Sequence, residues 1–229
     1  MKEGETIVYR HEMKQEITME ELLILRQRLS AVLKRDAHAV NGIYEIRSLY
    51  FDNARDKALR EKKDGINIRE KFRIRYYNGN TKFIKLEKKS KMNGLSRKDS
   101  TLLTKEQTQD MINGEYEWMK ASEAPLVREL YIKMMTEGLR PKTVVDYVRE
   151  PFVFAPGNVR VTLDYNIRTG ILETDMFNPQ CVMVPAGDAP IILEIKWDAY
   201  LPDLIKDLVH LENSHNEPFS KYAACRIYG

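Results

Sequence analysis

The stretch that decides the fold reads Arg69-Glu70-Lys71-Phe72-Arg73-Ile74-Arg75-Tyr76. Successive side chains of a strand point to opposite faces, so four cations share one face and three apolar side chains share the other. Neighbouring cations on that face lie about 7 Å apart, two residues along the strand. At an effective dielectric constant near 20, each adjacent pair repels by about 2 kcal/mol. Open water would screen most of this repulsion, whereas a confined space would need anions to offset it.

The same alternation recurs on most of the other predicted strands. Taken alone, one such strand is more often a solvated outer strand than part of a binding site. The repeated charged faces carry Arg10, Glu12 and Lys14; Lys85, Glu87 and Lys89; Tyr147 and Arg149; Arg160, Thr162 and Asp164; and Glu194 and Lys196. Because guanidinium groups match the oxygens of phosphate in fork geometry, this recurrence favours charged faces that converge on an oxyanion.

The remaining sequence predicts about eight strands and four or five helices in a meander-like order. Strands are expected at about 6–13, 43–51, 66–77, 81–89, 142–149, 152–154, 159–167 and 190–197, with extended segments near 95–100 and 181–184. Helices are expected from the capping boxes at Thr18 and Thr104 and over about 123–137 and 202–212, with short helical segments at about 53–63 and 220–227. Without regular βαβ alternation, this order indicates an α+β fold with an antiparallel sheet and helices packed outside it.

The sheet has two possible forms. It is either half-covered, with its charged faces in water, or closed into a barrel with those faces around a wet lumen. The arginine pattern favours the closed barrel. No repeat, low-complexity linker or composition break divides the chain, so residues 1–229 are expected to form a single domain.

Composition excludes several classes of protein. The 229 residues contain 37 Lys and Arg against 34 Asp and Glu, so the chain is no bulk polycation, and nucleic acid is not an expected partner. The two cysteines, Cys181 and Cys225, lack zinc-site spacing, and no GxxxxGK[ST] loop is present. Neither a signal-peptide core nor an apolar run of membrane-spanning length occurs, so a cytoplasmic location is expected.

Several ordered motifs resemble a known family. They are Ser48-Leu-Tyr-Phe-Asp52, Arg69-x-Lys-x-Arg-x-Arg75-x-Tyr77, Leu86-Glu-Lys88, Tyr147-x-Arg149, Arg160-x-Thr-x-Asp164, Leu193-Glu-Ile-Lys196 and Phe219-Ser-Lys-Tyr222. Each motif alone is weak, but the ordered set is similar to the VTC-type polyphosphate polymerase domain, a branch of the triphosphate tunnel metalloenzyme (CYTH-like) superfamily. The resemblance covers nearly the whole chain.

This resemblance implies a closed eight-stranded antiparallel tunnel, with ATP and polyphosphate as its ligands. It implies transfer of the γ-phosphoryl group of ATP to a growing polyphosphate chain, with Mn²⁺ or Mg²⁺. Glu194 would be the metal-binding carboxylate and Lys221 would meet the phosphate chain at a tunnel mouth, both acting in catalysis with Arg73 and Arg75. Further phosphate contacts are expected from Lys14, Arg10, Arg69, Lys71, Lys85, Lys88, Tyr147, Arg149, Arg160 and Lys196. The hairpin register leaves open whether Lys85 or Lys88 takes part.

One departure from the superfamily bears on the reaction. Its triphosphatase branch carries an N-terminal ExExK signature, whereas this chain reads Arg10-His-Glu12-Met-Lys14, with Arg10 in place of the first glutamate. The loss of that acid weakens the case for a second metal and for simple hydrolysis. Glu12 and Glu87 are secondary candidates for metal or water contact, and equally for salt bridges to the lumen cations. The N-terminal sensing domain and membrane segment of the eukaryotic polymerases are not expected here.

Two other functions remain open at this point. A tunnel triphosphatase would use water as the acceptor, acting on inorganic triphosphate, a nucleotide or an RNA 5′ end. A sensor of polyphosphate or nucleotide would keep the cations but perform no metal chemistry. The substitution at Arg10 and the Ser220-Lys221-Tyr222 segment favour the polymerase, and Glu194 argues against the sensor.

Overall fold

The structure is a computed structural model that describes residues 10–92, 95–211 and 219–226. Its strands are β1 (His11–Ile17), β2 (Lys34–Arg35), β3 (Tyr44–Asp52), β4 (Arg69–Tyr77), β5 (Asn80–Met92), β6 (Leu95–Leu103), β7 (Arg140–Phe154), β8 (Val159–Thr169), β9 (Val184–Pro185) and β10 (Ile191–Trp197). Its helices are α1 (Met19–Val32), α2 (Lys57–Lys63), α3 (Lys105–Asn113), α4 (Glu117–Lys120), α5 (Pro125–Thr136), α6 (Asp203–Val209) and α7 (Lys221–Ala224). The paired strands run antiparallel, which confirms the α+β class.

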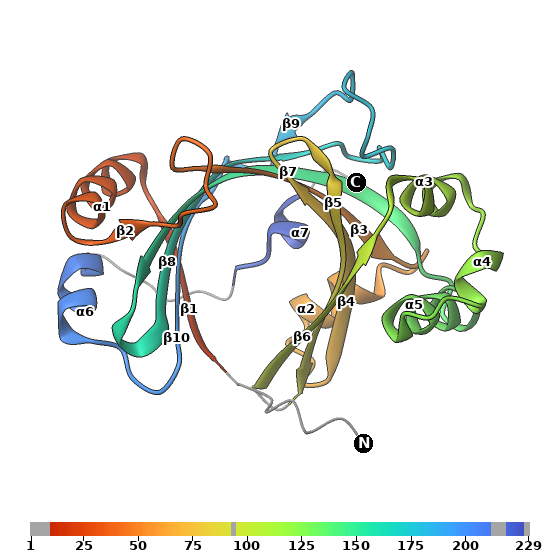
Figure 1. Cartoon of the computed structure of the whole chain (residues 1–229), viewed down its shortest axis with the longest axis horizontal. Helices are drawn as coiled ribbons and strands as arrows, with labels where there is room; N and C mark the ends of the chain where they lie inside the picture. The colour runs from red at the N-terminus through yellow and green to blue at the C-terminus, as the bar shows by residue number, and fades with distance from the viewer. Residues whose placement is uncertain (1–9, 93–94, 212–218, 227–229) are drawn as a thin grey trace.

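The sheet curls into a half-barrel and does not close. Eight strands pair in the order β1-β10-β8-β7-β3-β4-β5-β6, while β2 and β9 pair beside this path with β7 and β8. Across the described residues of β1 and β6 no ladder joins the two edges, which flank the opening in Figure 1. The prediction of a closed barrel is therefore wrong. Alternation indicates which side chains face inward, but closure depends on strand tilt and stagger, which alternation does not encode.

Two groups of helices cover the convex face of the sheet (Figure 1). On one side α1 and α6 bury apolar side chains against β8 and β10, as Leu25, Ile205 and Leu163 illustrate. On the other side α3, α4 and α5 cover β4 and β5, burying Phe72 and Ile74, the apolar half of the opening stretch. These contacts confirm the predicted outward packing. In the described part of the chain, no helix is both long and apolar enough to span a bilayer.

Helix α7 lies on the concave side of the sheet, contrary to the expectation that helices pack only outside (Figure 1). Tyr222 of this helix and Cys225, which directly follows it, join a buried cluster with Tyr50 and Tyr147 from the inner sheet face. The Tyr222 hydroxyl donates to Asp52 Oδ2 at 2.7 Å, which ties α7 to the end of β3. A helix of four residues has little stability alone, so these contacts determine where its first residue, Lys221, lies.

Local sequence signals predicted the helix starts and the central hairpin. Thr18 Oγ1 accepts from the backbone N of Glu21, whose carboxylate accepts from the backbone N of Thr18, and Thr104–Gln107 forms the same box. The β4–β5 turn has positive φ at Asn78 (51°) and Gly79 (66°), as a two-residue hairpin requires. The predicted boxes and turn are thus confirmed.

Several boundaries differ from the predictions. The strands expected at 142–149 and 152–154 form the single strand β7, and the extended segment at 95–100 belongs to the nine-residue β6. The segment expected near 181–184 forms only β9. The described residues contain seven α-helices, and one of them, the short α4, was not predicted. The start of the strand expected at 6–13, and the last residues of the helices expected at 202–212 and 220–227, lie outside the described residues.

Candidate functional site

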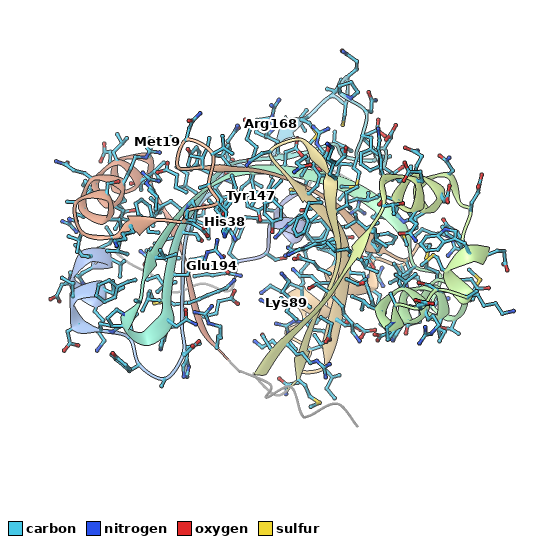
Figure 2. All side chains as sticks on the ribbon, in the orientation of Figure 1. Met19, His38, Lys89, Tyr147, Arg168 and Glu194 are labelled. Carbon is cyan, nitrogen blue, oxygen red and sulfur yellow. The ribbon has the colours of Figure 1, made fainter. Side chains whose placement is uncertain are left out.

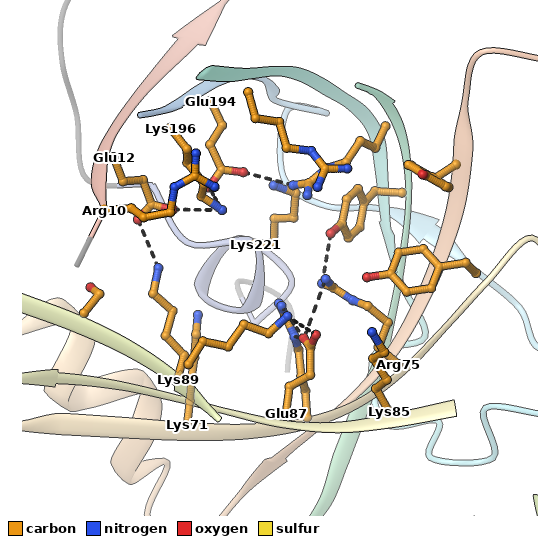
Figure 3. Close-up of a pocket in the computed structure, with 18 of the residues that line it drawn as sticks. Arg10, Glu12, Lys71, Arg75, Lys85, Glu87, Lys89, Glu194, Lys196 and Lys221 are labelled. Carbon is orange, nitrogen blue, oxygen red and sulfur yellow. Dashed lines mark hydrogen bonds and ion pairs between the residues drawn. The ribbon is translucent and has the colours of Figure 1, made fainter. Parts of the chain in front are cut away.

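The concave side of the half-barrel holds a cavity of about 1650 Å³, lined mainly by charged side chains (Figure 3). Thirteen cations line it: Arg10, Lys14, Lys71, Arg73, Arg75, Lys85, Lys89, Arg97, Lys98, Arg149, Arg160, Lys196 and Lys221. The carboxylates that line it are Glu12, Asp36, Glu87, Asp99 and Glu194. With thirteen cations against five carboxylates, the cavity has a strong positive field that favours anions.

Strands β4, β5 and β6 supply a cluster of three cations around one buried carboxylate. Glu87 lies 2.6 Å from Arg73 Nη2 and 3.7 Å from Arg75 Nη1, and Lys98 of β6 also contacts it. Burial by itself raises the pKa of Glu87, but Arg73, Arg75 and Lys98 together hold that pKa below its usual range. Arg75 also donates to Tyr147 Oη at 2.9 Å. The carboxylate therefore stays ionised and holds the guanidinium groups in place inside the cavity.

A second cluster joins β7, β8 and α7. Arg149 donates from Nε and Nη2 to the two oxygens of Asp164, at 2.6 and 2.7 Å. Lys221 Nζ lies 2.6 Å from Asp164 Oδ2 and 4.8 Å from the ring centre of Tyr147. Asp164 is fully buried and balances both cations. Lys221 thus lies in the interior of the cavity, as Figure 3 shows.

Glu194 lies among three cations on the same side of the cavity. Its carboxylate is 3.3 Å from Lys14, 3.1 Å from Lys196 and 3.0 Å from Arg149. Burial raises the pKa of Glu194, but Lys14 and Lys196 outweigh that effect and hold it well below the usual range of a glutamate. The group is therefore an anion at any pH near neutrality.

Glu12 and Glu194 are the carboxylates best placed to hold a metal ion. Lys14 Nζ lies between them, 3.2 Å from Glu12 and 3.3 Å from Glu194, so a cation already bridges the pair. No group of three His, Cys, Asp or Glu side chains suited to a metal occurs among residues 10–92, 95–211 and 219–226. Magnesium in phosphate sites commonly uses one or two carboxylates together with substrate phosphates. The donor set therefore fits an ion bound jointly with substrate, not a protein cage.

Lys71 is a cation without a balancing carboxylate. Within the described residues it forms no ion pair, and its ammonium lies 5.8 Å from the ring centre of Tyr50. Burial lowers the pKa of Lys71 well below its ordinary value, and Arg73, Lys89 and Lys14 lower it further. An anion placed beside Lys71 would therefore stabilise its charged form.

We expect triphosphate binding to be accompanied by proton uptake at Lys71. The pKa of Lys71 is depressed in the free protein and rises when an anion binds, so between the two values binding must take up a proton. Calorimetric titration with inorganic triphosphate at mildly alkaline pH, in two buffers of different ionisation enthalpy, measures this uptake.

The proton uptake should be clearly smaller in Lys71→Met than in wild type. It should not vanish, because other cavity lysines still contribute. Lys120→Met, on the outer helix α4, is the matched control and should behave as wild type. Equal uptake in wild type and Lys71→Met would contradict the assignment to Lys71.

Comparison with known families agrees with this geometry. The model of the VTC domain matches residues 9–227. The chain belongs to the VTC domain family. No curated protein matches the chain.

Solved structures give a weaker likeness to this VTC domain. A "putative adenylate cyclase" from Bacillus halodurans is 12% identical over 81% of this chain and 78% of its own, with a TM-score of 0.48. The PH1819 protein of Pyrococcus horikoshii is 15% identical over 88% and 84%, with a TM-score of 0.44. A second "putative adenylate cyclase", from Vibrio parahaemolyticus, is 10% identical over 88% and 83%, with a TM-score of 0.43.

The VTC domain brings most of the predicted site residues into one cavity. Twelve of them line it: Arg10, Lys14, Lys71, Arg73, Arg75, Lys85, Tyr147, Arg149, Arg160, Glu194, Lys196 and Lys221. Two do not line it. Arg69 lines a smaller neighbouring cavity of about 510 Å³, and Lys88 contacts Glu70 and Glu129 on the outer side. The register therefore places Lys85 inward and Lys88 outward, because they lie an odd number of residues apart.

Several residues that line the cavity of the VTC domain were not among the predicted site residues. Lys89 shares the inward face of Lys85 and lies on the concave side of the sheet (Figure 2), yet it was not among the expected phosphate contacts. Lys98 lies directly across from Lys89 on β6, so applying alternation to that segment would have found it. Asp36 follows β2 in a loop and contacts Arg160 at 2.8 Å, a pairing that no local pattern predicts.

Proposed function

We propose that this chain is an ATP-dependent polyphosphate polymerase that acts in the cation-lined cavity. The observation that carries the proposal is the convergence of thirteen lysines and arginines on one cavity, from strands at both ends of the sheet and from α7. Membership of the VTC domain family supports it. A site so rich in cations matches a substrate and a product that each carry several phosphates.

The cations would divide the phosphate groups between two walls of the cavity. Arg73 and Arg75, held by Glu87, form one wall, and Lys14, Lys196 and Arg149, held by Glu194 and Asp164, form the other. Lys71 adds a charge that no carboxylate of the described chain balances. Phosphoryl transfer depends mainly on positioning and on neutralising charge, and both walls supply these.

The reaction would break one phosphorus–oxygen bond and form another. A terminal oxygen of the polyphosphate chain attacks the γ-phosphorus of ATP, the bond to the β–γ bridging oxygen breaks, and ADP leaves with that electron pair. Glu194 and Glu12 would hold Mn²⁺ or Mg²⁺, which when bound supplies neutralisation of charge on the phosphate oxygens. The nearby arginines and lysines orient both chains in line, so no protein nucleophile is required.

Two features support polyphosphate, not water, as the acceptor. Arg10 replaces the first acid of the triphosphatase signature and pairs with Asp198 at 2.7 Å, so that position offers no carboxylate to a second metal or a water. Lys221 of the Ser220-Lys221-Tyr222 segment extends into the cavity, where it can contact a second chain of phosphates.

Incubation of the protein with ATP and Mn²⁺ tests the proposal. We expect long polyphosphate on a gel, together with ADP. Free phosphate without polymer would overturn the proposal in favour of a triphosphatase. Neither product, despite tight binding of triphosphate, would indicate a binding protein without turnover.

A further inference from the structure

One corner of the cavity differs from the rest because it carries aromatic and amide side chains in place of charges. We call it the aromatic corner; it consists of Val40, Tyr44, Tyr77, Asn78, Asn80 and Phe83. These residues come from the β4–β5 hairpin, from the start of β3 and, for Val40, from the loop before β3. The rings of Tyr44 and Tyr77 pack edge to face with their centres 5.6 Å apart, and Tyr77 pairs with Asn80 across the hairpin.

The apolar members of the aromatic corner are left uncovered. Phe83 is 44% exposed and Val40 56% exposed, although both line a cavity whose other walls are charged. Lys85 Nζ lies 4.7 Å from the centre of the Phe83 ring. An exposed ring beside a cation that has no carboxylate partner in the described chain offers a surface for a flat, uncharged group next to a site for a phosphate.

The two asparagines of the corner provide hydrogen-bond donors. Asn78 Oδ1 accepts from the backbone N of Glu45 at 2.8 Å, and Asn80 Oδ1 accepts from the backbone N of Lys82 at 3.0 Å. These bonds fix the orientation of both amides, so each Nδ2 is the free end. Neither Nδ2 donates to another described residue, and the ring nitrogens of a nucleobase are acceptors that could receive them.

The aromatic corner is next to the phosphate-binding wall. Lys85 is two residues from Phe83 along β5, about 7 Å, which leaves room for a sugar between a base on Phe83 and a phosphate on Lys85. Arg75 pairs with Lys85 across the strands, so the cations continue from there into the cavity. Figure 3 shows Arg75 and Lys85 together at one end and Arg10 and Lys89 at the other.

We propose that the aromatic corner binds the base of a nucleoside triphosphate, so that the chain distinguishes a nucleotide from inorganic triphosphate. This inference rests on the proposed function and adds to it the orientation of the nucleotide in the cavity. With its base on Phe83 and its first phosphate near Lys85 and Arg75, the nucleotide points its terminal phosphate towards Lys71 and the Glu194 wall.

The variant Phe83→Ala tests the aromatic corner, with binding of ATP and of inorganic triphosphate measured separately by calorimetry. We expect the affinity for ATP to fall about tenfold, as the loss of one base–aromatic stack implies. The affinity for inorganic triphosphate should change less than about twofold, because the cations remain. Phe83→Tyr should keep the affinity for ATP, and Val182→Ala, an exposed apolar residue outside the cavity, is the matched control.

The outcomes separate this inference from the proposed function. An equal loss of affinity for both ligands in Phe83→Ala, or no loss of affinity for ATP, would overturn the base site whether or not the protein makes polymer. Selective loss of ATP affinity would support the base site even in a protein that hydrolyses ATP without making polymer.

Discussion

The variant Glu194→Gln is expected to lower polyphosphate synthesis from ATP by at least about 100-fold, on the scale of removing one electrostatic catalytic group. Glutamine keeps the shape of the side chain but removes the charge that, together with Glu12, would hold the metal. Binding of triphosphate without metal should be retained or become tighter, because Lys14, Lys196 and Arg149 then lose a competing carboxylate. Initial rates with Mn²⁺ and calorimetric binding without metal measure the two effects.

Glu129→Gln is the control for this loss of charge. Glu129 lies on α5 and pairs with Lys88 on the outer side of the sheet, so its variant should keep wild-type rates. Full activity in Glu194→Gln would remove Glu194 from the metal site. Loss of triphosphate binding along with activity would instead show that the residue organises the cations and does not hold the metal.

The variant Asp164→Asn is expected to lower the free energy of unfolding by about 3–5 kcal/mol, the usual cost of removing one partner of a buried ion pair. Asp164 is fully buried and balances both Arg149 and Lys221, so the neutral amide leaves two cations in a cavity already rich in them. Urea denaturation measures the loss. Added triphosphate should recover part of it, because the ligand supplies the missing negative charge and binds the folded state.

Asp203→Asn is the matched control for Asp164→Asn. Asp203 pairs with Lys206 on the surface, where its side chain is 89% exposed, so the change should leave the free energy of unfolding close to that of wild type. A loss of less than about 1 kcal/mol in Asp164→Asn would mean that solvent in the cavity already screens the two cations.

Much of the site was predictable because alternation along a strand is a local property. The inward set of β4, which includes Lys71, Arg73 and Arg75, follows directly from counting residues, as do Arg149 and Arg160. Arg69 begins β4 and has the same parity, yet it lines a different cavity, because parity gives the face but not the position along the barrel axis. The choice between Lys85 and Lys88 also needed only the strand register.

Features that depend on distant contacts were not predictable in this way. The concave placement of α7 depends on Tyr222, which reaches Asp52 from 170 residues away. The pairing of Arg160 with Asp36 likewise joins a strand to a loop 124 residues distant. Whether the sheet closes was equally unpredictable from local sequence, because closure depends on the sum of tilts over eight strands and not on any single motif.

The open edge of the half-barrel has a consequence for how a long substrate could be loaded. Lys89 on β5 reaches Glu12 on β1 at 3.0 Å, so an ion pair, not a backbone ladder, connects β1 at one edge of the sheet to the strand beside the other edge, β6. An ion pair loosens with ionic strength, whereas a ladder of backbone hydrogen bonds responds far less. In the proposed polymerase, a polymer of many phosphates therefore need not be threaded from its end. It would enter sideways along the groove and displace Glu12 from Lys89, as its own charges replace that contact.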